Sequence, residues 1–339
     1  MKAIVYPEPG IFSLDEIADP EPGPGEVRLR VRLAGLCGTD VHLHAGEFFP
    51  VYPLTPGHEI VAEVDALGDD VDGLRLGDLV ALDNMISCGV CPPCRRGRPA
   101  FCRTLRALGV TDPGGFADYV IAPAGKCHPA HELTAEVAVF AEPTACAIHG
   151  LDVLDTRPGS DVCIFGAGPS GMLLAQLLRY TGGARVTMAA STQFKLDLAY
   201  SLGIDQVVLV DRANPADAMK SLRALAPDGF DIVVDATGAL AMLEECLAMT
   251  ADGGTFFVYG MAAEDAILGI PPYEVFRREL TVKGSFAQSF SFDRAMLALR
   301  TGRVQTDGLI THRFPLSDYD RAIETVAHDH GCLKAVIEM

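Results

Sequence analysis

The sequence predicts an α/β protein of two domains, one rich in β-strands and the other built on a doubly wound parallel sheet. Its 339 residues are enough for two domains. Strand signals split by Gly- and Pro-rich turns run through residue 125. From residue 158 onward, apolar strand segments alternate with helical stretches, the pattern of a parallel sheet with helices on both faces. We expect the β-rich domain over residues 1–149 and 285–339, and the parallel-sheet domain over 150–284.

The β-rich part begins with three short strand segments, AIVY, FSLDEI and EVRLRVRLAG. In the third segment apolar and charged side chains alternate, which is the period of a half-buried strand. The Pro/Gly cluster DPEPGPGE before it predicts a turn.

The pattern changes near residue 133, where LTAEVAVFAEPTACAIHGLDVL has helical periodicity. RPGSDVCIFGAGPSGMLLAQLLRYTG then predicts a strand, a glycine turn and a helix, and the apolar strands RVTMAA, QVVLV, DIVVDAT and GTFFVYG follow. After about residue 280 the short strands LTVKGSF and KAVIEM return, with an amphipathic helix, FDRAMLALRTG, between them. The parallel-sheet domain is therefore expected to be inserted between two parts of the β-rich domain.

Composition excludes several classes of function. The net charge is −18, from 27 basic and 45 acidic residues, and such a surface repels the phosphate backbone of nucleic acids. We find no uninterrupted apolar run of about 20 residues, so we expect no membrane span. The first ten residues, MKAIVYPEPG, predict a strand and a turn, and they lack the features of a signal peptide. We therefore expect a cytoplasmic protein with reduced thiols.

Four cysteines are crowded between residues 88 and 102 with the spacing C-x2-C-x2-C-x7-C. Four thiolates can enclose a Zn²⁺ ion in a tetrahedral site that keeps no open position, so such a zinc is structural. An iron–sulfur cluster is the rival metal group. Four free thiols are the remaining alternative, but they would be open to oxidation. The expected ligands are Cys88, Cys91, Cys94 and Cys102.

The segment VCIFGAGPSGML contains a G-x-G-x-x-G motif at Gly166, Gly168 and Gly171. It follows an apolar strand and opens an apolar helix, which is the context of a dinucleotide site. In such sites the glycines allow the tight turn, the approach of the pyrophosphate and close packing of helix on strand, and the helix N-terminus faces the phosphates. The alternative is a tight turn that binds no ligand.

Three further segments carry reactive side chains: GLCGTDVH, PGHEIVAEV and FAEPTACAIHG. Cys37, His58, Glu59 and Glu142 are of the ligand types that hold a catalytic zinc with one position open for water or substrate. Each also has an ordinary alternative, as a core cysteine, a loop histidine or a solvated acid. Their occurrence beside a four-cysteine segment and a dinucleotide turn favours the zinc interpretation.

These motifs occur together and in the order found in one family. The chain resembles the zinc-dependent medium-chain alcohol dehydrogenases over essentially its whole length, on C-G-T-D-x-H, G-H-E, the four-cysteine segment and GAGPSG. Within that family, the Glu-Pro pair of FAEPTACAIHG and the segment PGGFADY resemble the sorbitol and polyol dehydrogenase branch. The resemblance implies a GroES-like β-rich catalytic domain and a Rossmann cofactor domain.

The resemblance also implies roles for individual residues and two zinc ions per chain. Cys37 and His58 would bind the catalytic zinc directly, Glu59 would lie in or beside its coordination shell, and Glu142 would bind directly or through water. Thr39 and His42 would relay the alcohol proton to solvent through the nicotinamide ribose. Zinc would lower the pKa of the bound alcohol, and the alkoxide would then release hydride to the nicotinamide. Ala62 departs from the family, which usually has Gly there, but it removes no ligand.

The cofactor preference is predicted from the strand end VTMAASTQFK. An NAD site usually has an acid about 20 residues past the glycine turn, where it binds the ribose hydroxyls. Two distances locate that position. It lies nineteen residues past Gly171, and it lies thirteen residues before Gly203, which marks a helix end that recurs in the family. It is occupied by Ala190, which cannot repel a 2′-phosphate. Although no arginine occupies the usual partner position, we favour NADP over dual use or NAD. The expected cofactor residues are Gly166, Gly168, Pro169, Ser170, Gly171, Ala190, Ser191, Thr192, Lys195 and Thr237.

The substrate is less well defined. In sorbitol dehydrogenases an Arg-Tyr pair after the K-G-x-F strand faces the polyol, but here Ala287 and Gln288 stand in those positions. Gln288 can still bond a hydroxyl, and Phe48 and Phe49 are expected to narrow the pocket. We expect a secondary alcohol of a polyol or sugar. The alternative is a vicinal diol or an amino alcohol, such as butanediol or threonine, oxidised with NAD.

Two other classes of function remain as alternatives. One is a zinc-free reductase of activated alkenes, which the complete set of zinc ligands disfavours. The other is an NADP-sensing regulator without catalysis, which would be expected to have lost part of that set. We expect a homo-oligomer, a tetramer or dimer, in which the apolar segment FFVYGMAAEDAILGIPP forms an edge strand that pairs between subunits.

Overall fold

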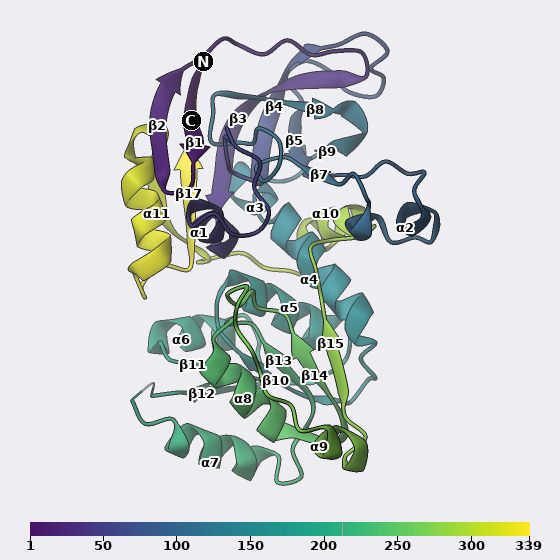
Figure 1. Ribbon diagram of the computed structural model, residues 1–339, viewed down its shortest axis with the longest axis vertical. Coiled ribbons are helices and arrows are strands. Elements are labelled where there is room, and N and C mark those ends of the chain that lie inside the picture. Colours follow the sequence, from purple (N-terminus) through teal and green to yellow (C-terminus); the bar gives the residue numbers. More distant parts are fainter. Residues whose placement is uncertain (212) are drawn as a thin grey trace. The chain divides into compact units, whose positions relative to one another are not determined.

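The computed structural model describes residues 1–211 and 213–339. The chain forms two compact units (Figure 1). The first unit comprises Met1–Ala145, Gln288–Gly302 and Thr306–Met339, and the second comprises Cys146–Ala287 and Arg303–Gln305. The second unit is thus inserted into the first. The divisions fall after Ala145 and Ala287, whereas the sequence predicts them after residues 149 and 284, without a return of 303–305 to the second unit.

In the described part of the chain, the first unit contains a seven-stranded, mainly antiparallel sheet with the order β16-β17-β3-β4-β5-β9, in which β8 also pairs with β3. Its strands are β3 (Glu26–Leu36), β4 (Glu59–Leu67), β5 (Leu79–Leu82), β8 (Tyr119–Pro123), β9 (Cys127–Pro129), β16 (Ile310–Pro315) and β17 (Lys334–Glu338). Two small antiparallel pairs accompany it: β1 (Lys2–Glu8) with β2 (Ile11–Glu16), and β6 (Met85–Ile86) with β7 (Arg106–Ala107). The helices are α1 (Gly38–His44), α2 (Pro92–Arg95), α3 (Ala135–Ala138), α10 (Phe292–Arg300), α11 (Tyr319–His328) and the 3-10 turns Pro99–Phe101, Ala124–Lys126 and Leu316–Asp318.

Strand β3 shows why this sheet forms. Its apolar positions, Val27, Leu29, Val31 and Leu33, are all buried in the core. The intervening arginines face away from that core and pair with acids of β4: Arg28 and Arg30 with Asp65, and Arg32 with Glu63. Since successive side chains of a strand point to opposite faces, the alternation seen in the sequence directly predicts this arrangement. The half-buried strand is therefore confirmed.

The second unit contains, within the residues described, a six-stranded sheet in which all neighbouring strands are parallel. The order is β12-β11-β10-β13-β14-β15, which is the 3-2-1-4-5-6 order of the doubly wound dinucleotide fold. The strands are β10 (Asp161–Phe165), β11 (Arg185–Ala190), β12 (Gln206–Leu209), β13 (Phe230–Asp235), β14 (Thr250–Val258) and β15 (Thr281–Gly284). The helices are α4 (Ala141–Leu154), which begins in the first unit, and α5 (Pro169–Tyr180), α6 (Gln193–Ser201), α7 (Ala216–Leu225), α8 (Leu240–Met249) and α9 (Pro272–Arg277).

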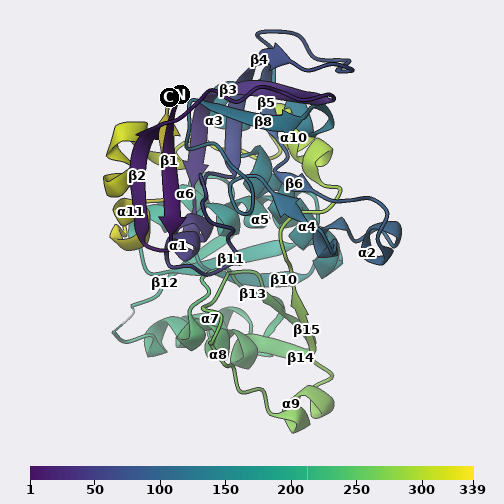
Figure 2. The same cartoon turned by 45° about the horizontal axis from the view of Figure 1, so that its top comes forward.

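The predicted edge strand is wrong. The segment FFVYGMAAEDAILGIPP begins in β14, which is hydrogen-bonded on both sides, to β13 and to β15. The edge is occupied by β15, as Figures 1 and 2 show, and the rest of the segment runs outside any strand before α9. Apolar character indicated a strand but could not tell a central strand from an edge, because a parallel sheet buries both faces of its central strands.

Among the residues that the structure describes, one helical stretch qualifies as a membrane span by length and composition. It runs from Ala135 to Leu154, and its 18-residue window has a mean hydropathy of 1.4, but Glu136, Glu142 and Asp152 interrupt it, so it is not the uninterrupted apolar run that the sequence analysis found absent. Of that window, 61% is buried inside the folded chain. A core helix passes the same test of length and hydropathy, and this degree of burial is what a core helix shows.

Candidate metal centres and cofactor site

The first candidate site is the Cys37 group, which we define as Cys37, His58 and Glu59. Cys37 follows β3 and caps α1: its Sγ accepts from the Thr39 N–H at 3.3 Å, and its own N–H donates to Asp40 at 2.9 Å. His58 and Glu59 lie where the chain enters β4, the neighbour of β3. The Cys37 Sγ and His58 Nε2 atoms are 3.1 Å apart, and the ligand atoms of all three residues lie within 4.8 Å of one another. The structure therefore brings together three residues that the sequence proposed as zinc ligands.

Asp40 lies on the Nδ1 side of the His58 ring. Its Oδ1 atom is 3.6 Å from Nδ1 of the imidazole, and both side chains are buried. Such a carboxylate orients a metal-binding histidine so that Nε2 faces the metal. Burial alone would lower the pKa of His58, but the Cys37 thiolate and the Asp40 carboxylate outweigh it and hold that pKa well above its usual range. The two neighbouring acidic groups thus favour positive charge at this imidazole, and they would equally favour a divalent cation there.

Lys334 completes the surroundings of Glu59. Its Nζ atom lies 2.6 and 2.7 Å from the two Glu59 oxygens and 3.2 Å from the Leu36 carbonyl, and both charged side chains are buried. Burial would lower the pKa of Lys334, yet Glu59 and Cys37 raise it above its usual value, so the lysine stays charged. A Cβ atom on Gly35 would lie 1.9 Å from Glu59 Oε2, so only glycine leaves room for this carboxylate.

Thr39 and His42 both lie on α1, one turn apart. His42 is partly exposed and bonds through Nδ1 to Glu47, which follows the helix. Glu142 lies in the first turn of α4 and is half-buried, but within the described residues it is outside the set whose ligand atoms all lie within 4.8 Å. The rings of Phe48 and Phe49 pack against each other with a tilt of 30° and centroids 4.6 Å apart.

The second candidate site is the four-cysteine group of Cys88, Cys91, Cys94 and Cys102, whose sulfurs lie within 4.8 Å of one another. The Cys91 sulfur is 3.4 Å from that of Cys94 and 3.8 Å from that of Cys102. A tetrahedral zinc with sulfur at about 2.3 Å places its ligands about 3.8 Å apart, so one ion fits. Backbone N–H donation from Cys88 lowers the pKa of Cys102 to about 6, whereas burial and neighbouring thiols raise that of Cys94 to about 11.

The glycine turn joins β10 to α5 in the second unit. Gly166 has φ +111°, and a Cβ atom there would meet the Ala236 carbonyl at 2.9 Å. A Cβ atom on Gly171 would lie 2.3 Å from the Gly166 carbonyl. A Cβ atom on Gly168 would meet nothing within 4 Å. The chain's own packing thus explains two glycines, whereas Gly168 borders open space at the N-terminus of a twelve-residue helix. That space fits a phosphate group approaching the helix end.

Ala190 is the last residue of β11, and Thr192 precedes α6. No carboxylate is present at this strand end, over the described residues 190–195. Arg185 lies at the opposite end of the same strand, where its Nε and Nη2 atoms donate to the two carboxylate oxygens of Asp161, each at 2.6 Å. Thr237 follows β13 and is held by buried Asp235, which accepts from its N–H at 3.0 Å and from its hydroxyl at 2.5 Å.

Comparison with known proteins identifies the family. The model of the alcohol dehydrogenase GroES-like domain matches residues 23–132, and that of the zinc-binding dehydrogenases matches residues 169–300. The chain is 39% identical to D-arabinitol dehydrogenase 1 of Uromyces fabae, over 100% of this chain and 97% of that protein. It is 36% identical to D-altritol 5-dehydrogenase of Agrobacterium fabrum, over 94% of both chains.

The chain belongs to the zinc-dependent medium-chain alcohol and polyol dehydrogenases. A solved structure agrees: a zinc-binding dehydrogenase of Sinorhizobium meliloti bound to NADP superimposes with a TM-score of 0.92 at 32% identity, covering 100% of this chain and 99% of that one. The expected α/β fold, with a GroES-like and a Rossmann domain, is confirmed.

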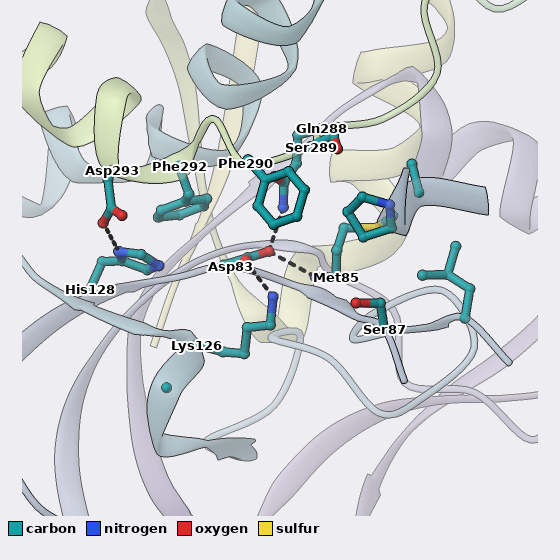
Figure 3. Close-up of a pocket in the computed structure, with 14 residues that line it drawn as sticks. Asp83, Met85, Ser87, Lys126, His128, Gln288, Ser289, Phe290, Phe292 and Asp293 are labelled. Atoms are coloured by element: carbon teal, nitrogen blue, oxygen red, sulfur yellow. Dashed lines mark hydrogen bonds and ion pairs between the residues drawn. The ribbon is translucent and has the colours of Figure 1, made fainter. Parts of the chain in front are cut away.

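Gln288 of this dehydrogenase lines a cavity of about 240 Å³ in the first unit, shown in Figure 3. Its amide donates to Asp83, a carboxylate that also accepts from Lys126 at 2.6 Å and from the Met85 N–H at 3.0 Å. None of the Cys37 group lines this cavity. The residue expected to bond a substrate hydroxyl is thus buried and already bonded within the chain.

Sequence reasoning missed two contributors to the dehydrogenase's metal site. Lys334 lies 275 residues from Glu59, and no local motif links them. Asp40 was visible in C-G-T-D-x-H but received no role, although an acid two residues before the motif's histidine was a signal worth testing. It is a partner of His58, which lies on another element.

Proposed function

We propose that this protein is a zinc-dependent dehydrogenase that interconverts a secondary alcohol of a polyol or sugar with the corresponding ketone and prefers NADP. The observation that carries the proposal is the Cys37 group, a half-buried thiol with a buried imidazole and a buried carboxylate, close enough for one ion. The names of the two polyol dehydrogenase relatives support the substrate class.

Cys37 and His58 would hold the catalytic zinc directly. Glu142 would contact it through water, since its carboxylate lies outside the compact group. Glu59 is held by Lys334 and lies beside the metal, where it can exchange with the water. When bound, zinc supplies a Lewis acid that lowers the pKa of the substrate hydroxyl. Cys37, His58 and the water held by Glu142 would leave one position of a four-coordinate zinc for that hydroxyl.

The chain's own residues would then move the proton. Thr39 accepts the hydrogen bond of the substrate hydroxyl, and His42 takes the proton and passes it to water. A bound nicotinamide would supply the hydride acceptor. Phe48 and Phe49 would narrow the entrance to the alcohol. Gln288 would act on the substrate only after releasing Asp83, so we assign it a weaker role than the sequence indicated.

NADP preference is proposed from Ala190, with Ser191, Thr192 and Lys195 offering donors and positive charge for a 2′-phosphate. The NADP bound to the Sinorhizobium relative supports it. The test is Ala190→Asp, which we expect to lower kcat/KM for NADP about tenfold or more, because the carboxylate repels the phosphate and binds the ribose hydroxyls of NAD. Ala190→Ser is the matched control. A wild-type enzyme that prefers NAD tenfold would refute the preference.

The substrate class is tested with a panel of polyols and their ketoses, assayed with both cofactors. We expect the highest kcat/KM on a polyol. Higher values for threonine or butanediol would overturn this assignment in favour of an amino alcohol or diol dehydrogenase.

We propose that the four-cysteine group holds a second, structural zinc. The sulfur spacing supports one ion rather than an iron–sulfur cubane, whose cysteines bind different iron atoms. Metal analysis should give about two zinc ions and no iron per chain. A zinc-free reductase would contain none.

We also propose a homo-oligomer, a dimer or tetramer, in the cytoplasm. The support is the edge strand β15, where Val282 is exposed, together with the nearby exposed apolar residues Tyr273 and Phe276 of α9. An edge with apolar side chains is a ready surface for pairing with a second copy. Light scattering should give a mass of at least two chains, and Val282→Lys should lower it.

A further inference from the structure

The residue that follows α1, Glu47, carries an inference that rests on the proposed role of His42. Nδ1 of His42 bonds to Oε2 of Glu47. The backbone closes on the same histidine, because the Glu47 N–H donates to the His42 carbonyl at 2.9 Å. Glu47 therefore bonds to His42 twice: its side chain bonds to the imidazole ring, and its backbone N–H bonds to the carbonyl group.

The loop reaches this position in an uncommon backbone conformation. Gly46, Phe48 and Phe49 all have positive φ, at +84°, +68° and +47°. A Cβ atom on Gly46 would lie 2.9 Å from Pro9, so the turn is also closely packed. Non-glycine residues adopt the left-handed region at a cost and cluster where surrounding structure imposes them. The result of this conformation is that the Glu47 carboxylate faces the helix end that carries His42.

The bond determines the tautomer of His42. An ionised carboxylate has no hydrogen to donate, so Nδ1 of the ring must carry the hydrogen in this contact. The lone pair of the neutral ring is then on Nε2, which makes no hydrogen bond within the described residues. That nitrogen is the one able to receive a proton arriving from Thr39 and the ribose. Without Glu47 the two tautomers would compete.

Solvent exposure increases from the histidine to the glutamate. The His42 side chain is 25% exposed and that of Glu47 is 35% exposed. A proton that reaches Nε2 creates an imidazolium, which the carboxylate stabilises through a charge-assisted bond. The proton on Nδ1 can then pass to Glu47 and from there to water. No atom is lost or gained: the alcohol releases one proton, and water receives one.

We propose that Glu47 is a positioning residue of the proton relay: it holds His42 in the tautomer that accepts at Nε2 and delivers the proton to solvent. It touches neither the substrate nor the metal ligands, and it acts only through His42.

The experiment compares Glu47→Gln, His42→Ala and the double variant, each loaded with zinc, with a polyol from the panel that wild-type enzyme oxidises. Glu8→Gln is the control, because this exposed carboxylate ends β1 beside Pro9 and the same loop. Hydride transfer is followed by stopped-flow absorbance of the reduced cofactor. We expect Glu47→Gln to slow it about tenfold to a hundredfold, as loss of an orienting partner does, and to leave zinc content and the melting temperature unchanged.

The double variant separates positioning from folding. If Glu47 acts through His42, adding Glu47→Gln to His42→Ala has no further effect. An additive loss, or a Glu47→Gln rate within twofold of wild type while His42→Ala is slow, overturns this inference and leaves the proposed function standing. Wild-type rates in His42→Ala itself would refute the relay and this inference together.

A second readout does not depend on turnover. Nitrogen NMR of the zinc-loaded, cofactor-free protein distinguishes the two tautomers of the His42 ring. We expect hydrogen on Nδ1 in the wild type and a mixture in Glu47→Gln. Hydrogen on Nε2 in the wild type would overturn the proposal.

Discussion

The two candidate metal groups of this protein are built in opposite ways. The four cysteines of one group lie within fifteen residues of sequence, on a loop whose side chains are mostly exposed or half-exposed. The Cys37 group joins two neighbouring strands, and its buried Glu59 pairs with a lysine from the other end of the chain. The four-cysteine group comes from one short segment and has four identical ligands. The Cys37 group combines different ligand types that the fold brings together.

The difference shows what each group can do. Four equivalent thiolates close the coordination shell, so the metal there stabilises a loop. In the Cys37 group the thiol and the imidazole would bind the zinc while Lys334 holds the Glu59 carboxylate, and this leaves a coordination position open for substrate. The second arrangement requires support, since Glu59 is a buried charge that would be unpaired without Lys334.

The largest expected effect is on turnover. Cys37→Ala or His58→Ala should lower kcat by about a thousandfold or more, because the Lewis acidity of the metal is worth several kcal/mol and each 1.36 kcal/mol is tenfold. Binding of NADPH, measured by titration of its nicotinamide fluorescence, should be unchanged because the proposed cofactor residues lie in the second unit. Cys127→Ala, a buried cysteine of β9 outside both groups, is the control. Near-normal activity in both variants would refute the assignment.

The next effect is on stability. Lys334→Met should lower the free energy of unfolding by about 3–5 kcal/mol, because it leaves the Glu59 carboxylate buried and unpaired. Adding Glu59→Met should restore most of the loss, since replacing both partners of a buried pair by apolar side chains is often neutral. Urea denaturation of the two variants measures this. If the double variant is no more stable than Lys334→Met alone, the ion pair is not the cause.

A smaller effect is expected at the four-cysteine group. Cys94→Ser should reduce the zinc content by about one ion per chain and lower the melting temperature, while kcat per remaining zinc stays within about twofold, because this group closes its shell and does no chemistry. Metal analysis and calorimetry on one sample test it. Loss of turnover at unchanged stability would mean that the group is not structural.

The smallest effect is a pH dependence of the same group. The pKa of Cys102, about 6, lies below the ordinary thiol value. The contribution of its thiolate to stability and zinc binding is therefore complete above about pH 9 and is lost as the pH falls through about 6. Release of zinc to a chelating dye should therefore rise between pH 7 and pH 5. Equal release at both pH values would contradict this.

The local features of the protein could be predicted from sequence because they depend on periods of a few residues. The alternation in β3, the glycine turn before α5 and the spacing of Cys88 to Cys102 each reflect the geometry of one segment. The parallel sheet followed from the alternation of strands and helices.

Tertiary structure decided what lies far apart in the chain. It placed Lys334 against Glu59, it turned Gln288 toward Asp83 across 205 residues, and it made β15 rather than β14 the edge of the sheet. Such pairings depend on strand order and on which buried charges must find partners, and the periodicity of one segment carries no information about either. Sequence therefore determined the types of metal ligand and the turns, while packing decided which charged groups lie against the ligands.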